Sequence, residues 1–200
     1  KNTNHSELNN ILFMNTVNEK ENIINNYASS LTRINGYDGV LLEYCNNVII
    51  NNPILQGCPE RALYSSSSNN VTINNPVCKY TGGLKFVGYN NIVVENFVVN
   101  NATINEVDGD ALLQLYRCKN VFINGVTSFS SGDNGCGWII RSGQTLENVK
   151  LINCNVSRIV RSVFDFNADF PTRANETYCK KVELQNIKAD NVGLIKYLPS

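Results

Sequence analysis

A short phrase of alternating apolar and polar residues recurs along the chain. In NNVIINNP (46–53) and NNVTINNP (69–76), an apolar anchor, Val48 or Val71, is followed two positions later by another apolar residue. Period-two alternation is typical of a β-strand with one buried face, and helical periodicity does not fit these segments. We therefore expect one such strand at every copy of the phrase. The anchors are Ile23, Val48, Val71, Ile92, Val121, Val149 and Val182.

Asparagine takes fixed places around these anchors. Asn tolerates the left-handed backbone that a sharp corner requires. Amides stacked at the spacing of neighbouring strands, ~4.8 Å, can hydrogen-bond along a column, so the pattern predicts asparagine ladders. The asparagines directly before an anchor are Asn22, Asn47, Asn70, Asn91, Asn120 and Asn148. Those four residues after one are Asn52, Asn75, Asn96, Asn153 and Asn186, with Gly125 at that place in the copy anchored at Val121.

Two further strands fit between successive anchors. Upstream of each anchor lies an apolar segment, as in GVLLEY (39–44) and ALLQLY (111–116). A further pair follows the corner, and the examples are Pro53/Leu55, Pro76/Cys78 and Phe97/Val99. Three short strands in each repeat of roughly 25 residues describe one coil of a parallel β-helix. We expect an all-β, single-stranded parallel β-helix of about seven coils.

The two ends of the sequence differ from its middle. In residues 6–17, after an N-cap candidate at Ser6, the apolar residues that share one helical face are Leu8, Ile11 and Leu12. We therefore expect a short N-terminal helical cap, with residues 1–20 as cap or linker and residues 21–200 as the β-helix domain. The C-terminal VGLIKYLPS reads as one more strand, so we expect the β-helix to be part of a longer chain or its edge to be covered by another subunit.

Composition and charge exclude several classes of function. The 200 residues carry 17 basic and 17 acidic side chains, so the positive excess that nucleic-acid binding needs is missing. No apolar run approaches the ~20 residues of a membrane-spanning helix, so we expect no membrane insertion. The seven cysteines form no C-x-x-C pair and the only histidine is His5, so we expect no metal site. Buried apolar filling is the role we expect for the cysteines.

One stretch of the chain resembles a known family. VDGDALLQLYRCKNVFINGVTSFSSGDNGCGWII (107–140), followed by LENVKLINC (146–154), is similar to the right-handed parallel β-helix superfamily. That superfamily includes pectate lyases, polygalacturonases and bacteriophage tailspikes. The resemblance covers roughly residues 20–195 and implies right-handed coils. It is specific for fold rather than activity, because members share the coil while differing in chemistry.

The family's catalytic motifs map onto this sequence only in part. Asp108 and Asp133 match carboxylates of the polygalacturonase-type pattern, whereas Asn134 stands where a further Asp is expected. The family's Gly-His-Gly has no counterpart. Arg158 and Arg161, one coil beyond Asp133, would suit the arginine base of a pectate lyase, although the arginine-containing motif of that family does not occur in this sequence. The resemblance implies a glycoside hydrolase or polysaccharide lyase and leaves open whether this chain is an enzyme.

Coil geometry gives an independent reason to group the acidic residues. Equivalent positions of successive coils stack ~4.8 Å apart. Asp108, Asp133 and Asp165 all precede the same kind of strand, so they can line one face, with Asp110 at its margin. Glycoside hydrolysis uses paired carboxylates of this kind, although Asp-Gly and Gly-Asp are also ordinary corner sequences. We expect no cofactor; calcium would suit these acidic loops but nothing in the sequence requires it.

Aromatic and basic residues of the same coils suit a sugar ligand. The apolar face of a sugar can stack on an aromatic ring, and arginine can contact acidic sugars. The candidates are Tyr116, Trp138, Arg141, Arg158 and Arg161. We hypothesise polysaccharide recognition along the flank of the β-helix, with or without glycosidic-bond cleavage, as in the shaft of a tailspike.

The alternative is a non-catalytic β-helical adhesin or structural spacer of a cell-surface or virion appendage. In that function the coil supplies only length and stiffness. Both functions predict an extracellular or virion-surface location. The tailspike resemblance implies a homotrimer.

Overall fold

The computed structural model describes residues 6–14, 38–58, 61–88, 92–105, 111–129, 136–166 and 179–192. Within these ranges the chain forms strands and no helix, and all strands belong to one parallel sheet. The strands are β1 (Ser6–Asn9), β2 (Leu12–Met14), β3 (Asp38–Glu43), β4 (Asn46–Asn51), β5 (Ile54–Gln56), β6 (Arg61–Ser66), β7 (Asn69–Asn74), β8 (Val77–Lys79), β9 (Leu84–Val87), β10 (Val94–Asn105), β11 (Ala111–Phe129), β12 (Cys136–Phe166) and β13 (Cys179–Val192).

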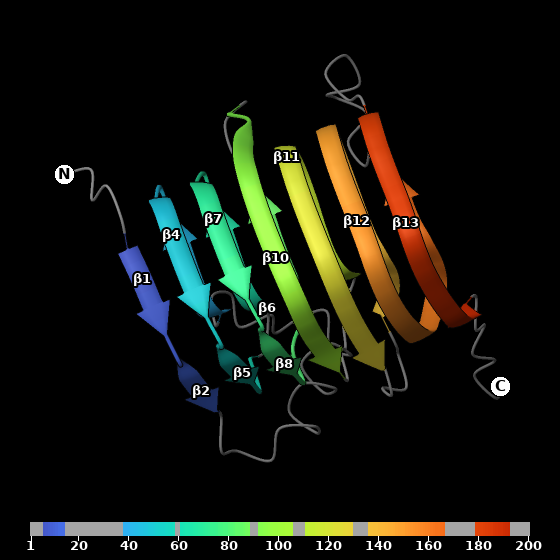
Figure 1. Cartoon of the computed structure of the whole chain (residues 1–200), viewed down its shortest axis with the longest axis horizontal. Coiled ribbons are helices and arrows are strands. Elements are labelled where there is room, and N and C mark those ends of the chain that lie inside the picture. Colours follow the sequence, from blue (N-terminus) through green and yellow to red (C-terminus); the bar gives the residue numbers. More distant parts are fainter. Residues whose placement is uncertain are drawn as a thin grey trace, which may run out of the picture.

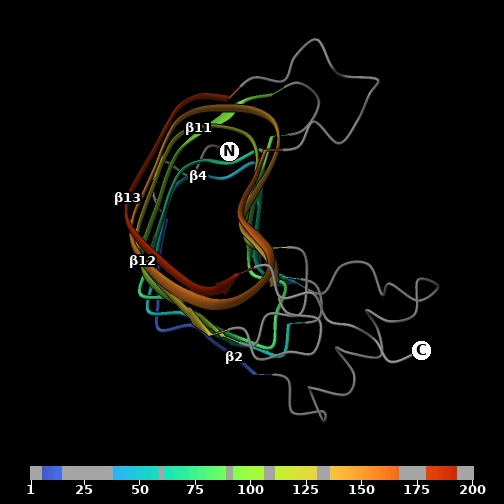
Figure 2. The ribbon, with the colours of Figure 1, turned by 90° about the vertical axis from the view of Figure 1, so that its right-hand side faces the viewer.

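The strands stack in three columns around a coil. The front column, face-on in Figure 1, contains β1, β4, β7 and the corresponding parts of β10 to β13. The bottom column contains β2, β5, β8 and the later parts of β10 to β13. The back column contains β3, β6, β9 and the first parts of β11 and β12, and it bends inward in the end-on view of Figure 2.

This curled parallel sheet confirms the predicted all-β, right-handed parallel β-helix. The chain descends through the front column and rises through the back column while it advances from coil to coil (Figure 1). The predicted upstream strands form the back column, where Leu63 pairs with Leu84 and Leu84 pairs with Leu113. The anchors that stand in register within the front column are Val48, Val71, Val121, Val149 and Val182.

The predicted N-terminal helix is wrong for the described part of residues 6–17. Ser6–Asn9 forms β1, which pairs with β4, and Leu12–Met14 forms β2, which pairs with β5. Asn10, with a φ of 54°, makes the corner between them and accepts a hydrogen bond from Asn52 at 3.3 Å. An open sheet edge offers these residues backbone partners that a short isolated helix cannot match. The anchor predicted at Ile23 lies outside the described residues.

One predicted anchor within the described part is also wrong. Val71 pairs with Phe97 and Phe97 pairs with Val121, so Phe97 rather than Ile92 is the anchor of its coil. Ile92 is 44% exposed, whereas Phe97 is fully buried. The same apolar alternation begins at Ile92 and again at Phe97, so the sequence allows two registers, and side-chain packing selects the second. Phe97 packs in the core against Phe86 with ring centroids 4.7 Å apart.

This shift also corrects the residues assigned around that anchor. The asparagine before it is Asn96 rather than Asn91, and the one four residues after it is Asn101 rather than Asn96. The pair that follows the corner is Ala102/Ile104, both buried, instead of Phe97/Val99.

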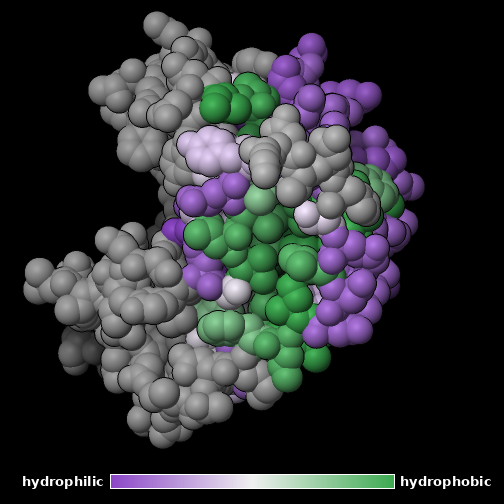
Figure 3. Space-filling view, turned by 90° about the vertical axis from the view of Figure 1, so that its left-hand side faces the viewer, coloured by the Kyte–Doolittle hydropathy of each residue, from purple (hydrophilic) through white to green (hydrophobic). Residues whose placement is uncertain are grey.

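Alternate side chains of the front column fill the core. The anchors and the residues two positions later are buried in the inner coils, and each contributes about 1.5–3 kcal/mol relative to an exposed side chain. Figure 3 views the N-terminal end of the stack, where apolar residues occupy the middle and polar residues line the front-column side. The front-column core residues are Val48, Ile50, Val71, Ile73, Phe97, Val99, Val121, Ile123, Val149 and Leu151.

Asparagine ladders join the corners of successive coils. The leading ladder, before the anchors, has amide N-to-O distances of 2.7, 3.1 and 2.8 Å and consists of Asn70, Asn96, Asn120 and Asn148. The trailing ladder, after the anchors, has distances of 3.3, 2.9 and 3.1 Å and consists of Asn10, Asn52, Asn75 and Asn101. All of these residues have a positive φ. In every ladder bond the later coil donates through Nδ2 and the earlier coil accepts through Oδ1.

We predict that Asn75→Ala lowers the free energy of unfolding by about 3–4 kcal/mol. The variant loses two ladder hydrogen bonds, ~1 kcal/mol each, and places an alanine in the left-handed region, which costs about 1–2 kcal/mol. Asn75→Gly loses the same bonds but tolerates the positive φ of 52°. Urea denaturation should therefore find the glycine variant the more stable of the two. Equal losses would contradict a backbone contribution at this corner.

Buried cysteines take part in the core, as predicted. Cys58, Cys78, Cys118 and Cys154 are buried, whereas Cys179 is exposed. Burial raises the pKa of the Cys118 thiol to about 12 and that of Cys154 to about 11. These thiols therefore stay protonated and unreactive at neutral pH.

We predict that iodoacetamide at pH 8 labels Cys179 well before Cys118, as measured by peptide mass spectrometry. Because the folded pKa of Cys118 exceeds its unfolded value of ~8.5, the protonated thiol stabilises the fold below that pH. This contribution should be lost as the pH rises toward about 12. Labelling of Cys118 as fast as Cys179 would show that the core opens at this coil.

Candidate functional site

The side chains of the four acidic residues predicted for catalysis lie outside the described part of the chain. Asp108, Asp110 and Asp133 lie outside the described residues, and so does the side chain of Asp165, whose backbone belongs to β12. The strands that follow the first two acidic segments are neighbours, because Ala111 in β11 pairs with residue 138 in β12. The alignment of the carboxylates along one face stays a prediction.

The residues predicted to bind sugar are divided between two columns. Tyr116 lies in the back column, and Arg141 is in register with Gln114 of the same column. Arg158 lies instead at the end of a bottom-column strand, exposed, with its guanidinium 5.5 Å from the ring of Phe129. Trp138 pairs with Ala111 in the back column, and Arg161 lies in β12; the side chains of both, like that of Arg141, lie outside the described part.

A cluster of cations and tyrosines occupies the outer side of the back column. We call the residues of this group the back cluster: Asp38, Arg61, Tyr64, Lys85 and Tyr116. The Arg61 guanidinium stands 4.2 Å from the Tyr64 ring centroid, and Lys85 Nζ lies 5.7 Å from Tyr64 and 5.3 Å from Tyr116. A cation above an aromatic ring contributes about 0.5–2 kcal/mol. The cluster therefore links three neighbouring strands, β6, β9 and β11, through side chains alone.

The back cluster is partly withdrawn from solvent, which strengthens its electrostatics. Tyr64 is 8% exposed although it alternates with the core residues of β6. Arg61 Nη1 lies 3.5 Å from Asp38 Oδ1. Burial raises the pKa of Asp38, and the positive charges of Arg61 and Lys85 partly oppose that rise. The local dielectric is therefore low enough for each charge to act strongly on its neighbours.

A buried arginine adjoins the back cluster at the next corner. Arg117 follows Tyr116 with a φ of 53° and is 4% exposed. Its Nη2 has no hydrogen-bond partner within the described part of the chain. A buried guanidinium donor without a partner is costly, so this atom is poised to bind an incoming acceptor. Arg61, Lys85 and Arg117 give this side three cations, against the carboxylates of Asp38 and Glu43 in the described strands of the back column.

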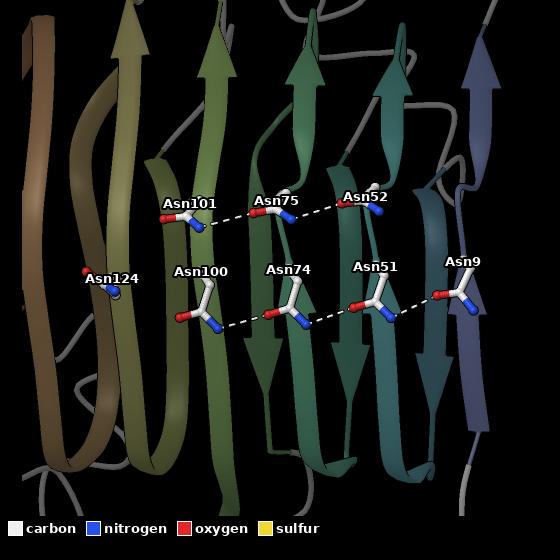
Figure 4. A pocket seen from close by; sticks show the side chains of 8 residues that line it. All are labelled: Asn9, Asn51, Asn52, Asn74, Asn75, Asn100, Asn101 and Asn124. Atoms are coloured by element: carbon white, nitrogen blue, oxygen red, sulfur yellow. Dashed lines mark hydrogen bonds between the residues drawn. The ribbon is translucent and has the colours of Figure 1, made fainter.

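A hollow lined by asparagine lies on the front column, on the other side of the coil. Its volume is about 520 Å³, and Figure 4 shows its side chains in two parallel rows. We call it the asparagine hollow, and its lining consists of Asn9, Asn51, Asn52, Asn74, Asn75, Asn100, Asn101 and Asn124. One row belongs to the trailing ladder. The other is a third ladder, the strand-end ladder, which consists of Asn9, Asn51, Asn74 and Asn100 with distances of 2.8, 2.8 and 2.9 Å.

Both rows of the asparagine hollow are interrupted at the same coil. Gly125 stands where the trailing ladder requires an asparagine. Asn153 of the following coil donates instead to Oδ1 of Asn124 at 2.9 Å, which draws Asn124 out of the strand-end ladder. Among the described residues, nothing donates to Oδ1 of Asn100 or Asn101, and Nδ2 of Asn124 has no acceptor.

Sequence reasoning missed the strand-end ladder and the back cluster, although each has a signal in the sequence. Asn-Asn doublets at 9–10, 51–52, 74–75 and 100–101 place a second amide directly before each trailing-ladder residue. Tyr64 and Lys85 are register partners that alternate with the core residues of the neighbouring strands β6 and β9, which marks them as outward-facing. Both signals become visible only when the coils are aligned in the correct register.

Comparison with known protein families, with curated proteins and with solved structures finds no match. The strand pairing establishes a solenoid-like parallel sheet that is compatible with the β-helix superfamily. Membership of that superfamily stays a prediction. Within the described ranges, no helix is long and apolar enough to cross a membrane. No group of three or more His, Cys, Asp or Glu side chains in this part of the chain could hold a metal ion.

We predict that Arg61→Met and Lys85→Met each raise the pKa of Asp38 further, and Arg61→Met the more strongly. Both cations favour the carboxylate, and Arg61 has the larger effect. Carboxyl-carbon NMR titration measures this directly. Because the folded pKa exceeds the unfolded one, the contribution of Asp38 to stability is present below pH ~4 and is lost as the pH rises through the folded pKa.

The matched control for this titration is Lys150→Met. Lys150 makes an ion pair of the front column, 2.9 Å from Glu183, and should leave the pKa of Asp38 unchanged. A response to Lys150→Met as large as that to Lys85→Met would mean that the effect is not local to the back cluster.

Proposed function

We propose that the protein recognises a polysaccharide along the flank of its β-helix, with the back cluster as the contact surface. The observation that carries this proposal is the alternation of cations and tyrosine rings across three neighbouring coils. Tyrosine rings can pack against the apolar faces of sugar rings, while Lys and Arg donate to hydroxyl or carboxylate oxygens. Membership of the pectate lyase and polygalacturonase superfamily is part of the same proposal.

The direction of the cluster suits an extended ligand. Its members lie on successive strands, so the surface repeats along the axis of the stack, as a polysaccharide repeats along its own axis. The register extends the same file by one strand, from Lys85 through Gln114 to Arg141. Arg117 adds a buried donor without a described partner beside Tyr116.

Cleavage of the bound polymer is the catalytic form of this proposal. Asp108 and Asp133 would act as a pair: one carboxylic acid protonates the leaving glycosidic oxygen while the other carboxylate activates water or attacks the anomeric carbon. Asp110 or Asp165 would support them. The pairing of the strands that follow Asp108 and Asp133 supports a location on neighbouring coils.

The second candidate function is a non-catalytic adhesin or spacer. The observation that favours it is the set of asparagine ladders, which rigidify the stack without any contribution from a binding surface. An extracellular or virion-surface location and a homotrimer would accompany either function.

We predict that Lys85→Ala weakens binding to acidic polysaccharide at least about tenfold, because the cluster loses its central cation. Lys79→Ala is the matched control, since Lys79 lies 4.8 Å from the ring of Tyr80 in the bottom column, away from the back cluster. Affinity electrophoresis against acidic and neutral polymers measures the effect, and added salt should weaken it. Equal losses for the two variants would argue against the back cluster as the contact surface.

We predict that the protein releases new reducing ends or unsaturated products from a polymer that it binds, and that Asp133→Ala abolishes this release without abolishing binding. Both carboxylates are required for proton transfer to proceed. Product assays on the bound polymers make the measurement. A lack of product from every bound polymer would leave recognition without cleavage, and a lack of binding would favour the spacer.

A further inference from the structure

We propose that the asparagine hollow is a second ligand site, specific for an uncharged, hydroxyl-rich polymer such as a neutral polysaccharide, and independent of the back cluster. The hollow lies on the front column, whereas the back cluster lies on the opposite side of the coil. Its lining consists only of amide side chains, which carry no net charge.

The amides of the hollow retain hydrogen-bonding capacity toward a ligand. An asparagine side chain has two N–H donors and an oxygen that accepts twice. Within a ladder, Asn74 uses one donor toward Asn51 and one acceptor site toward Asn100, so one of each remains. A sugar hydroxyl both donates and accepts, and it therefore matches this remaining pair.

The interruption at Gly125 leaves amide atoms of the hollow without a partner among the described residues. Oδ1 of Asn100 and Oδ1 of Asn101 receive no donor from the described residues, and Nδ2 of the neighbouring Asn124 has no acceptor there. Asn100 and Asn124 are register partners on adjacent strands. One hydroxyl that donates to Asn100 and accepts from Asn124 would bridge the broken ladder.

A file of side chains that is apolar except for one threonine runs beside the strand-end ladder, and we call it the apolar file. These residues stand two positions before the ladder asparagines on the outer side of the front column, and they are partly exposed. The file consists of Ile49, Thr72, Val98 and Phe122. An apolar file next to an amide row matches a sugar ring, which has C–H groups on its faces and hydroxyls at its edge.

Charge sets the chemical class of the ligand. Phe122, at the C-terminal end of the apolar file, is the register partner of Lys150 on the next strand. Nζ of Lys150 forms an ion pair with Glu183 at 2.9 Å. At the other end of the file Glu7 accepts a hydrogen bond from Asn51 at 2.9 Å. An acidic polymer would find no free cation among the lining amides, so a neutral one is favoured.

Gly125→Asn tests the role of the interruption. The new side chain would bridge Asn101 and Asn153 and release Asn124 to pair with Asn100, which closes both ladders. An added Cβ would lie 2.9 Å from Asn101 Oδ1, a side-chain end that can rotate to accept, and the φ of 78° is positive, as Asn tolerates. Affinity electrophoresis with an uncharged glucan, an uncharged mannan and an uncharged galactan should show at least a tenfold loss relative to the parent protein.

A matched pair of variants separates ligand binding from ladder stability. Asn101→Gly and Asn120→Gly each remove one ladder amide at a positive φ, but only Asn101 lines the hollow. Asn101→Gly should weaken neutral-polymer binding at least tenfold and Asn120→Gly should leave it unchanged, with circular dichroism reporting that both variants fold.

Binding at the asparagine hollow and binding at the back cluster respond differently to salt and to Lys85→Ala, so the experiment distinguishes the two surfaces. Binding at the hollow should persist in 1 M salt and in Lys85→Ala, whereas binding at the back cluster should be lost in both. The proposal is overturned if none of the three neutral polymers binds, if Asn101→Gly and Asn120→Gly weaken binding equally, or if Lys85→Ala abolishes binding of the neutral polymer.

Discussion

The corner between two strands is the constraint on which this structure depends. Each coil must turn within one residue, and the described corners of the front column do so with a positive φ, which most side chains resist. Asparagine resolves two problems there at once, because it tolerates that backbone and its amide finds a partner in the next coil. The ladders fix which residues lie above one another. Core rows and surface clusters then follow from that register.

The parallel β-helix could be predicted from the sequence because its signals are local. The period-two phrase and the asparagine corners recur within each coil, so a few residues suffice to recognise them. The exact register could not be predicted, since 92 and 97 offer equivalent alternation and only the packing of Phe97 against Phe86 separates them. The N-terminal strands were missed for a similar reason. Leu8 fits a helical stripe and a strand equally well, and the unpaired edge of β4 decides in favour of the strand.

The candidate sites depend on relations between coils that the sequence does not spell out. Tyr116 was recognised as an aromatic residue, but its contact with Lys85 requires knowing that β9 and β11 are neighbours. The predicted acidic residues precede their strands by unequal lengths, so register alone does not align them. The two sides of the coil nevertheless differ clearly in chemistry. The back column combines cations with tyrosines, whereas the asparagine hollow combines neutral amides with an apolar file.

The uniform direction of the ladder bonds gives each described ladder an electrical polarity. In every described ladder bond the amide of the later coil donates and the amide of the earlier coil accepts, so the dipoles of the bonded amides add rather than cancel. In an α-helix, peptide dipoles aligned in this way sum to a field at both ends. By the same reasoning, within the part of the chain that the structure describes, Nδ2 of Asn9 begins the strand-end ladder with partial positive charge. Oδ1 of Asn186, whose own amide donates to Asn153 at 3.1 Å, ends the described column of the later coils with partial negative charge. Each ladder therefore carries a dipole along the axis of the stack, although all of its side chains are uncharged.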